Sequence, residues 1–329
     1  MTQHRALLSA FLLSFAASAA SFSNFVQADT YPSRPVRMVV PFAPGGASDF
    51  IGRILQPKLS EELGEQIVVE NRPGASGGIG VEAAANATPD GYTLLLGNVS
   101  AMGIGPNLFA SIRKNAARLV PLTLVVDVPG ALGITGSLPP NNLKEFIAYA
   151  RANEGKLSYG SAGYASAQRM AFEFFMHKAG IKLLHVAYKG GAGASTIATM
   201  SGEVAATMVT TASLVPHAKS GKIKVLAVVA KKRIPALPDT PTMIESGFPE
   251  LDLGSWQGIY VPKGTPKAIM DRLYKVSVKV VHDPVIGQQY EKVSAQQITS
   301  NSPADFAKFM RQQDAFWGKL IKDLDIKVE

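Results

Sequence analysis

Apolar runs of strand length alternate along this chain with amphipathic stretches of helix length. The first run, residues 36–40, leads through the loop Pro-Phe-Ala-Pro-Gly-Gly-Ala-Ser-Asp at 41–49 into a stretch of helical period that reaches Leu59. Similar units follow, each with a strand, a loop of small residues and a helix. This alternation predicts an α/β fold in which helices cover both faces of mostly parallel sheets. Further strands are expected at residues 66–70, 92–96, 183–188, 204–209 and 223–229.

Glycines and capping residues indicate where several helices begin and end. Ser48 is expected to cap the first helix, and Gly64 to end it. Gly180 is expected to end the helix after the third loop. Thr265-Pro266 and Ser302-Pro303 are expected to begin two later helices, because Pro fits the first helical turn. These helix ends are therefore predicted from local residues.

The N-terminus has the composition of a secretory signal peptide. Arg5 gives it a basic start, residues 6–22 are largely apolar, and a small-residue end reaches Ala28. No later run has the ~20 apolar residues needed to span a membrane. Since the sequence contains no Cys, no residue near the cleavage site could carry a lipid. We expect cleavage of residues 1–28 to release a soluble protein into the periplasm, without a lipid anchor.

Length and charge restrict the organisation and the partners of the mature chain. Removal of 28 residues from 329 leaves 301, which exceeds the size at which one core usually keeps growing, so two lobes are expected. The formal charge of +8 falls to +7 without Arg5, which is compatible with anionic ligands and with solubility alone. Lys and Arg are scattered, apart from one run at 231–233. We therefore expect no nucleic-acid partner.

The sequence contains no recognisable catalytic or metal centre. Without Cys there is no thiol nucleophile, and the four histidines after residue 28 form no helical i, i+4 pair suited to a metal. The serines of the Gly-rich loops lack the Gly-x-Ser-x-Gly elbow. Neither a Walker loop nor Gly-x-Gly-x-x-Gly follows the first strand, so no nucleotide is expected. The sequence predicts no cofactor and no metal, and it favours a binding protein over an enzyme.

The Gly-rich loops are suited to binding an anion. Glycine lets backbone N–H groups approach a ligand, and the N-terminus of the following helix attracts negative charge. Open α/β sheets bind their ligands at the carboxyl ends of the strands, where these loops lie. Ser48, Ser161 and Ser166 are expected either to bind the ligand or to cap helices. Asp49 would repel an anion, so it is expected to order loop N–H groups.

Six short segments resemble the signatures of one known family. They are Pro-Phe-Ala-Pro-Gly-Gly-Ala-Ser-Asp at 41–49, Glu-Asn-Arg-Pro-Gly-Ala at 70–75, Pro-Asp-Gly-Tyr-Thr-Leu-Leu at 89–95, His-Val-Ala-Tyr-Lys-Gly at 185–190, Leu-Pro-Asp-Thr-Pro-Thr at 237–242 and Val-Pro-Lys-Gly-Thr-Pro at 261–266. Together they span the mature chain. The chain resembles the substrate-binding proteins of tripartite tricarboxylate transporters, the extracytoplasmic solute receptors also called Bug proteins.

The resemblance implies a two-lobed, type II periplasmic-binding-protein fold that closes on a small carboxylate. Lobe 1 is expected to comprise residues 29–127 and 256–329 and lobe 2 residues 128–255, with the ligand cleft between them. In this family main-chain groups, Ser/Thr hydroxyls and ordered waters hold the carboxylate. By position, the resemblance implies these ligand-binding residues: Ala43, Gly45, Gly46, Ala47, Ser48 and Asp49 in the first loop, and Gly160, Ser161, Gly163 and Ser166 in the facing loop.

Two departures from the family pattern bear on the ligand. A His often follows the second loop in the family, whereas this chain has Gln168-Arg169. An acidic residue often follows the fifth strand, whereas this chain has Thr210-Thr211. An added cation and a missing anion favour a ligand with a second anionic group. Arg169 is expected to pair with a distal carboxylate, the alternative being an exposed Arg on a helix face. Thr210 completes the expected ligand-binding residues.

The same resemblance implies partners and leaves alternatives open. The membrane components of a tripartite tricarboxylate transporter would receive the ligand, or a sensor kinase would read the liganded protein, and we expect a monomer. Dicarboxylates, aromatic acids and amino acids are all compatible with the loops. The competing class is an enzyme acting on small organic acids, with His185 and Asp90 as general-base candidates. Trp256 is a candidate for the cleft, and Trp317 for core packing.

Overall fold

The computed structural model describes residues 31–188, 191–218, 220–251 and 253–326. The chain divides into a short unit, Met1–Ser33, and a compact unit, Arg34–Glu329, to which the helices and strands below belong. The predicted signal peptide, residues 1–28, lies outside the described residues.

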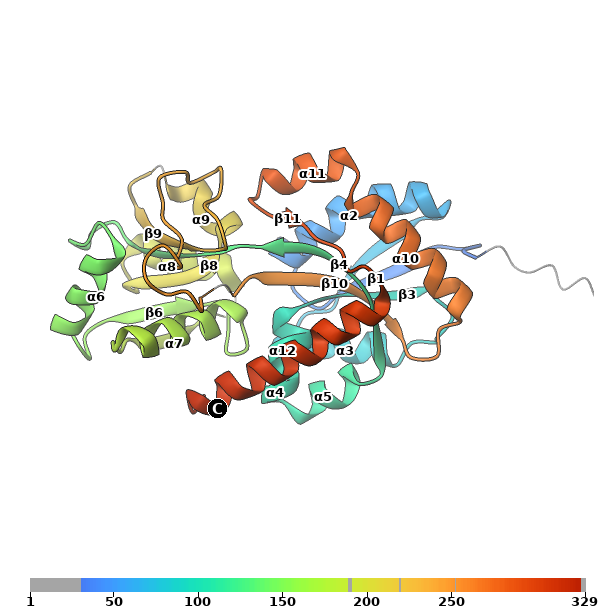
Figure 1. Cartoon of the computed structure of the whole chain (residues 1–329), viewed down its shortest axis with the longest axis horizontal. Helices are drawn as coiled ribbons and strands as arrows, with labels where there is room; N and C mark the ends of the chain where they lie inside the picture. The colour runs from blue at the N-terminus through green and yellow to red at the C-terminus, as the bar shows by residue number, and fades with distance from the viewer. Residues whose placement is uncertain (1–30, 189–190, 219, 252, 327–329) are drawn as a thin grey trace, which may run out of the picture. The chain divides into compact units, whose positions relative to one another are not determined.

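Six strands form the first sheet, in the order β11-β4-β10-β3-β1-β2 (Figure 1). Helices α2, α10 and α11 lie on one side of these strands, and α3, α4, α5 and α12 on the other. Short helical turns, η2 and η3, follow β2 and β3. The strands are β1 Val36–Val40, β2 Ile67–Asn71, β3 Thr93–Asn98, β4 Leu119–Val128, β10 Ser255–Pro262 and β11 Gln296–Gln297. The helices are α2 Ala47–Leu63, η2 Ala75–Gly77, α3 Gly78–Ala85, η3 Val99–Ile104, α4 Gly105–Leu108, α5 Ala110–Ala116, α10 Lys267–Val281, α11 Pro284–Glu291 and α12 Pro303–Asp323.

Five strands form the second sheet, in the order β7-β6-β8-β5-β9. All of them come from the middle of the chain. The strands are β5 Gly130–Thr135, β6 Ser158–Ser161, β7 Leu184–Ala187, β8 Ala206–Thr210 and β9 Ile223–Val229. The helices are α6 Leu143–Ala152, α7 Ala167–Ala179, α8 Gly191–Ser201 and α9 Thr211–Ala218.

Both sheets are flanked by helices, as predicted for an α/β fold, and both are mixed. Strands of successive β–α–β units are parallel, as in the pairs of β1 with β2 and β3 and of β6 with β7 and β8. Strands β4, β5 and β10 pair antiparallel with their neighbours. The sheets therefore contain more antiparallel pairing than helix–strand alternation alone predicts. The reason is that β4 continues almost directly into β5, and β10 returns the chain to the first sheet.

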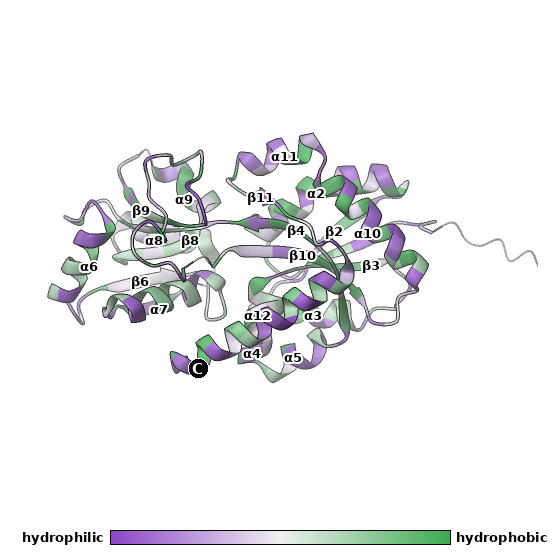
Figure 2. Ribbon diagram, in the orientation of Figure 1, coloured by the Kyte–Doolittle hydropathy of each residue, from purple (hydrophilic) through white to green (hydrophobic). Residues whose placement is uncertain are grey.

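Buried side chains form separate clusters around the two sheets. Phe146, Phe172 and Phe175 are central to the cluster beneath α6 and α7. Around the first sheet the cluster contains Phe306 and Trp317 of α12, and the core role predicted for Trp317 is confirmed. In Figure 2 the helices carry both hydrophobic and hydrophilic residues, as expected for helices that cover a sheet with one face.

Several predicted boundaries are confirmed by the backbone. Gly64 and Gly180 follow α2 and α7 in the left-handed conformation, with φ of 81° and 60°. Strand β9 has the predicted bounds. Ser302 caps α12 by accepting a hydrogen bond from the N–H of Asp305. Strand β1 also has the predicted bounds, and the other predicted strands begin or end one or two residues from the predicted positions.

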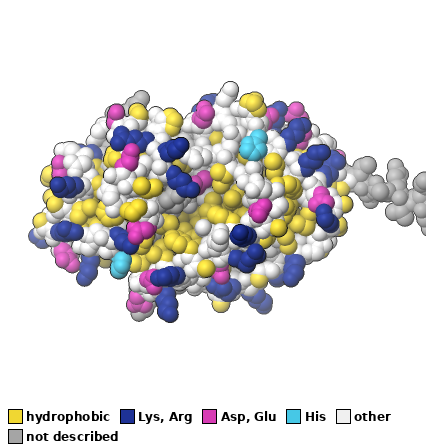
Figure 3. Space-filling model, viewed as in Figure 1, with side chains coloured by type: hydrophobic (Ala, Val, Ile, Leu, Met, Phe, Trp, Pro, Cys, Tyr) yellow, Lys and Arg dark blue, Asp and Glu magenta, His cyan; other side chains and the backbone are white. Residues whose placement is uncertain are grey.

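Charged side chains are dispersed on the visible surface. Figure 3 shows Lys and Arg scattered over this face, with hydrophobic side chains gathered toward its middle. This distribution agrees with the absence of long basic runs from the sequence.

Candidate functional site

The first loop is a tight turn that leads into helix α2. Gly45 has a φ of 79°, in the left-handed region that favours glycine. Its N–H donates to Oδ2 of Asp49 at 2.9 Å, so the Asp49 side chain ties the loop to the helix. The N–H of Gly46 donates to the carbonyl of Ala43 at 3.4 Å. The prediction that Asp49 orders loop N–H groups is confirmed.

Helix α2 begins at Ala47, with Gly46 as its N-cap. Gly46 has no side chain with which to cap the helix. The expectation that Ser48 caps this helix is wrong, because Ser48 already lies in the first turn and is buried. The helix therefore begins without a side-chain cap beside the exposed residues 43–46, and such a terminus favours an anion.

Asp49 is buried, and its charge is balanced by its own helix. Nε of Arg53, one turn later, donates to Oδ2 of Asp49 at 3.0 Å, and Nη2 lies 3.0 Å from Oδ1. Burial raises the pKa of Asp49, but the hydrogen bonds from Arg53 and Gly45 outweigh this effect and hold the pKa below its usual value. The carboxylate is ionised and paired, so it repels a nearby anion less than an unpaired Asp would.

Ser48 faces the end of strand β3. Nδ2 of Asn98 donates to Oγ of Ser48 at 3.1 Å, and Oδ1 of Asn98 accepts from the N–H of Ala101 at 3.0 Å. Because Ser48 accepts this bond, its hydroxyl proton can be donated to another oxygen. Asn98 is a polar residue of this region that the sequence analysis missed. Its position at the end of an apolar strand was the available signal.

The second loop folds around the hydroxyl of Ser161. The N–H of Gly163 donates to Ser161 Oγ at 3.1 Å, and Nε2 of His185 lies 2.7 Å from the same oxygen. A Cβ at Gly160 would stand 2.6 Å from Oγ of Ser195, so glycine allows β6 to pack closely there. Ser161 is 0% exposed. Its hydroxyl therefore organises the loop in this conformation.

The start of helix α7 connects the second loop to the first sheet. Oγ of Ser166 accepts from the N–H of Arg169 at 3.2 Å, which confirms Ser166 as the N-cap. The N–H of Ala167 donates to Oγ of Ser100 at 3.2 Å. Ser100 lies in η3, the turn that follows β3. This turn thus lies between the two predicted loops.

Arg169 is held inside the second part of the fold. It is 7% exposed, so the alternative of an exposed Arg on a helix face is wrong. Its Nη1 donates to the carbonyl of Tyr164 at 2.9 Å, and its Nε lies 3.6 Å from Oε1 of Glu173. The Tyr159 hydroxyl donates to the same Glu173 oxygen at 2.6 Å. The pairing of Arg169 with a ligand carboxylate stays a prediction.

His185 is half-buried and lies on β7, within the strand predicted at residues 183–188. Its ring lies against Tyr159 and Tyr164, with centroid distances of 5.0 and 5.4 Å. Burial, aided by the positive charge of Arg169, lowers the pKa of His185 to about 4. The imidazole is therefore neutral at pH 7.

Thr210 is buried at the carboxyl end of β8. Its Oγ1 lies 3.3 Å from Oγ of Ser213. The neighbouring Thr211 donates to the carbonyl of Pro129 at 3.2 Å and lies 3.5 Å from that of Val293. Within the described residues, no hydrogen bond joins Thr210 to either loop. Its ligand contact also stays a prediction.

A second polar residue that the sequence analysis missed lies on strand β10. Gln257 is directly opposite Asn98 in the pairing of β10 with β3. It is 1% exposed, and its Oε1 has no hydrogen-bond partner among the described residues. A Gln inside an otherwise apolar strand was the signal in the sequence, because buried polar groups are usually paired.

Trp256 belongs to the interior of the first part of the fold. Its Nε1 and that of Trp317 both donate to Oε1 of Gln313, at 2.9 and 2.8 Å. Its ring packs edge-on against Phe306 and Phe309. A cavity of about 250 Å³ reaches Trp256 and Gln313. These contacts do not test whether Trp256 also lines the ligand cleft, which stays a prediction.

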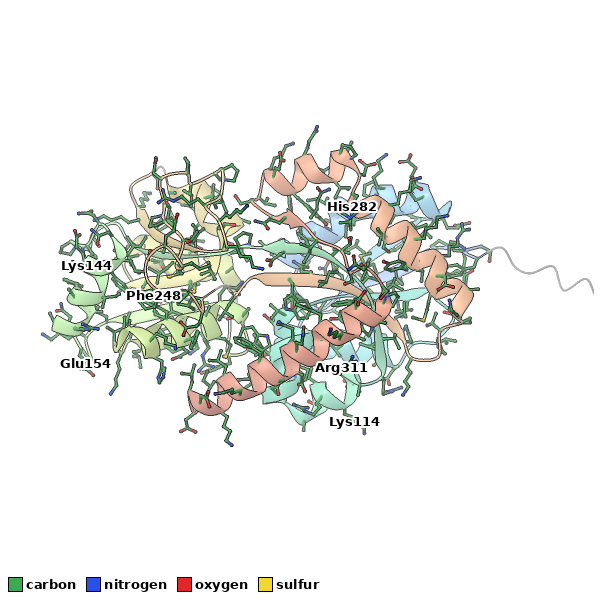
Figure 4. All side chains as sticks on the ribbon, in the orientation of Figure 1. Lys114, Lys144, Glu154, Phe248, His282 and Arg311 are labelled. Atoms are coloured by element: carbon green, nitrogen blue, oxygen red, sulfur yellow. The ribbon has the colours of Figure 1, made fainter. Side chains whose placement is uncertain are left out.

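A larger cavity of about 550 Å³ lies beside helix α6. Lys144 and Phe248, both labelled in Figure 4, contribute to its lining. None of the predicted ligand-binding residues lines either of these two cavities. The Gly-rich loops therefore define a different region of the molecule.

The described part of the chain has neither a metal-binding cluster nor a membrane-spanning helix. There, no group of three or more His, Cys, Asp or Glu residues is placed to hold a metal ion. No helix in that part is long and apolar enough to cross a membrane.

Two mixed sheets, with Gly-rich loops at the carboxyl ends of their strands, define a two-lobed type II periplasmic binding protein. A match to a known family identifies which family of binding proteins this is. The model of the tripartite tricarboxylate transporter family receptor matches residues 51–326. The chain belongs to this family, whose members are periplasmic solute-binding proteins, and it is a Bug-type receptor.

Three solved structures illustrate the similarity. The periplasmic binding protein BugD is 36% identical, with a TM-score of 0.81 over 91% of this chain and 100% of that one. Rpa4515 of R. palustris, solved with adipate, is 29% identical, with a TM-score of 0.84 over 90% of this chain and 99% of that one. MatC of Rhodopseudomonas palustris, solved with malate, is 27% identical, with a TM-score of 0.79 over 88% of this chain and 100% of that one.

Proposed function

We propose that this protein captures a small carboxylate in the periplasm by closure of two lobes and delivers it to a tripartite tricarboxylate-type transporter. The observation that carries the proposal is that two loops rich in hydrogen-bond donors both contact the end of β3 and the turn that follows it. Nδ2 of Asn98 donates a hydrogen bond to Oγ of Ser48 at 3.1 Å. The N–H of Ala167, at the start of α7, donates to Oγ of Ser100 at 3.2 Å. Backbone N–H groups and hydroxyls of this kind can replace the hydration shell of a carboxylate.

The proposed lobes are residues 29–127 with 256–329, and residues 128–255. Sheet membership supports this division, because strands β1–β4, β10 and β11 form one sheet and β5–β9 the other. The chain passes between the sheets near residue 129 and again near residue 254. Two such crossings suit a hinge, and the proposed ligand cleft lies between the lobes.

The proposed ligand-binding groups are those of the two loops, with Arg169 and Thr210. The N-terminus of α2 and the hydroxyl of Ser48 would receive one carboxylate oxygen each. Asp49 and Arg53 neutralise each other, at 3.0 Å, so the loop needs no cation from solvent. Nε of Arg169 lies near Glu173, so only the remaining N–H groups of its guanidinium would bind a distal carboxylate.

The relatives support a carboxylate as the ligand. One was solved with adipate and another with malate, and both are small dicarboxylates. We extend this chemistry to the present chain because both relatives match it over almost their whole length, with TM-scores of 0.84 and 0.79.

We further propose that residues 1–28 direct export and are cleaved, and that the mature protein is soluble, monomeric and without a lipid anchor. The composition of residues 1–28 supports export and cleavage, and the lack of Cys supports the absence of a lipid anchor. The partner would be the membrane components of the transporter, with a sensor kinase as the alternative. Both would distinguish the closed form from the open one.

An enzymatic function has one observation in its favour, the contact of 2.7 Å between Ser161 and His185. A nucleophile and a base lie at such a distance in hydrolases. However, Ser161 is 0% exposed, and with a pKa of about 4 His185 is a poor base at pH 7. Asp90 is paired with Arg34 at 3.0 Å in a turn. Binding is therefore the better proposal.

A thermal-shift screen of residues 29–329 tests this function. Mono- and dicarboxylates, aromatic acids and amino acids are added singly, and a ligand at ~100 times its Kd should stabilise the protein by about 2.7 kcal/mol. Ser48→Ala should weaken the response to the best acid, whereas Ser201→Ala, at the exposed end of α8, should not. A panel without any stabilising acid would refute carboxylate binding.

A further inference from the structure

Gln257 lies beside the proposed carboxylate site on a strand buried along its whole length. Side chains alternate along a strand, so Gln257 points to the face opposite to that of Trp256, which packs toward α12. Its register partner is Asn98, and directly paired residues of antiparallel strands place their side chains on the same face. Since Asn98 contacts Ser48 of α2, Gln257 lies on the α2 face of the sheet.

The position of Gln257 along its strand also fits a contact with the ligand. Asn98 is the last residue of β3, so its cross-strand partner lies at the carboxyl edge of the parallel strands. Ligands of open α/β folds bind at this edge. The α2 N-terminus begins at the same edge, since Ser48 lies in its first turn.

The hydrogen bonding of the two amides differs. Asn98 uses its Nδ2 toward Ser48 and its Oδ1 toward the N–H of Ala101. Oε1 of Gln257 is buried and has no partner among the described residues. A buried acceptor without a donor is costly, so this oxygen favours a ligand that brings a donor with it.

We propose that Gln257 is a specificity-determining residue that accepts a hydrogen bond from a hydroxyl group of the solute. The inference rests on the proposed function and narrows the ligand to a hydroxycarboxylate, with its carboxylate at the first loop and its hydroxyl at Gln257. A hydroxyl suits the site better than an ammonium, because Asp49, the acid of the first loop, is already paired with Arg53. An ammonium beside a neutral amide would lack a counter-charge.

The test compares acids that differ only in the hydroxyl. Titration calorimetry at pH 7 on residues 29–329 uses malate against succinate, lactate against propionate, 2-hydroxyglutarate against glutarate, and 2-hydroxyadipate against adipate. In the wild-type protein the hydroxylated member of the pair that fits should bind roughly tenfold tighter or more. Gln257→Met, which keeps the volume and removes the amide, should reduce this ratio to about one.

Two further variants make the result specific. Gln257→Glu keeps an acceptor oxygen, so the preference for the hydroxylated acid should persist although both acids bind more weakly. Gln288→Met, at an exposed position of α11, should leave both affinities unchanged. If one of the two variants at position 257 folds poorly, the other still tests the proposal by comparison with the wild type.

Each other outcome overturns a defined part of the proposal. Equal affinities in the wild-type protein, or a preference that survives Gln257→Met, would show that Gln257 does not read a hydroxyl, while carboxylate binding itself would stand. Failure of every acid to bind would overturn the proposed function as well. A lower melting temperature of unliganded Gln257→Met with an unchanged ratio would assign Gln257 a structural role only.

Discussion

The hydroxyl of Ser100 accepts a hydrogen bond of 3.2 Å from the backbone N–H of Ala167. Ser100 follows a strand of the first sheet, and Ala167 is the first residue of α7, which packs on the second. The N–H groups of the first helical turn have no partner within their own helix. Ser100 therefore satisfies one of these groups from the other half of the fold.

Ser100→Ala should lower the free energy of unfolding by about 0.5–1.5 kcal/mol, because it leaves the N–H of Ala167 without this acceptor. Urea unfolding, followed by circular dichroism, measures the change. Ser201→Ala serves as the control, since that serine lies at the exposed end of α8. Equal stabilities of the wild type and Ser100→Ala would mean that this contact contributes nothing in solution.

Asp49→Ala should weaken carboxylate binding by about tenfold, or ~1.4 kcal/mol, because the N–H of Gly45 loses the oxygen that fixes the loop. Asp49→Asn keeps an acceptor for that N–H, although it loses the charge that pairs with Arg53. We expect Asn to retain more affinity than Ala in calorimetric titrations with the best acid of the screen. If Asn and Ala were equally impaired, charge pairing with Arg53 would matter more than loop closure.

Gly80→Ala should destabilise the protein and weaken ligand binding. A Cβ at Gly80 would stand 2.6 Å from Cα of Pro41, at the start of the first loop, and 3.0 Å from the carbonyl of Arg72. Backbone must move to relieve this contact, and the cost exceeds the gain of ~1 kcal/mol that Ala brings to a helix.

The matched control is Gly193→Ala on α8, where a Cβ would meet nothing within 4 Å. This change should be neutral or stabilising by up to ~1 kcal/mol. Melting temperatures of the two variants, measured side by side, make the comparison. A Gly80→Ala protein as stable as Gly193→Ala would contradict the packing of α3 against Pro41.

His185 should make stability depend on pH between about 6.5 and 4. Its pKa falls to about 4 in the folded protein, whereas an unfolded His titrates near 6.5. The unfolded chain therefore binds more protons in this interval, and stability that is complete above pH 6.5 is lost as the pH falls. After allowance for solvent screening, the loss should be on the order of 1–2 kcal/mol.

Urea unfolding at pH 7.5, 5.5 and 4.5 measures this dependence. His185→Asn cannot titrate, so its curve should be flatter by the same amount, whereas His282→Asn, at an exposed position, should follow the wild type. Parallel curves for the wild type and His185→Asn would show that other groups govern the acid sensitivity.

Local signals predicted much of the fold. Gly64 and Gly180 end helices because each adopts a positive φ that costs glycine little. Ser302 caps its helix because its hydroxyl reaches the N–H of Asp305. The hydrogen bond by which Asp49 orders the first loop was also predictable, since Asp49 lies about one helical turn from Gly45. In each case the interacting groups are a few residues apart.

Contacts between residues far apart in the chain could not be predicted from the sequence. Gln257 and Asn98 are paired because β10, which follows every strand of the second sheet in the sequence, returns to the first sheet. The same is true of Ser100 and Ala167. Ser48 seemed a helix cap because Ser commonly caps helices, but Gly46 takes that position and Asn98 engages the Ser48 hydroxyl.

The most direct test of carboxylate capture is a calorimetric titration of residues 29–329 with the best acid of the screen and, separately, with its primary amide. Both ligands have nearly the same shape, but only the acid carries a charge for the first loop. We predict saturable 1:1 binding of the acid and a loss of at least tenfold in affinity for the amide. Equal binding of acid and amide, or of neither, would contradict the proposal that the loops hold a carboxylate.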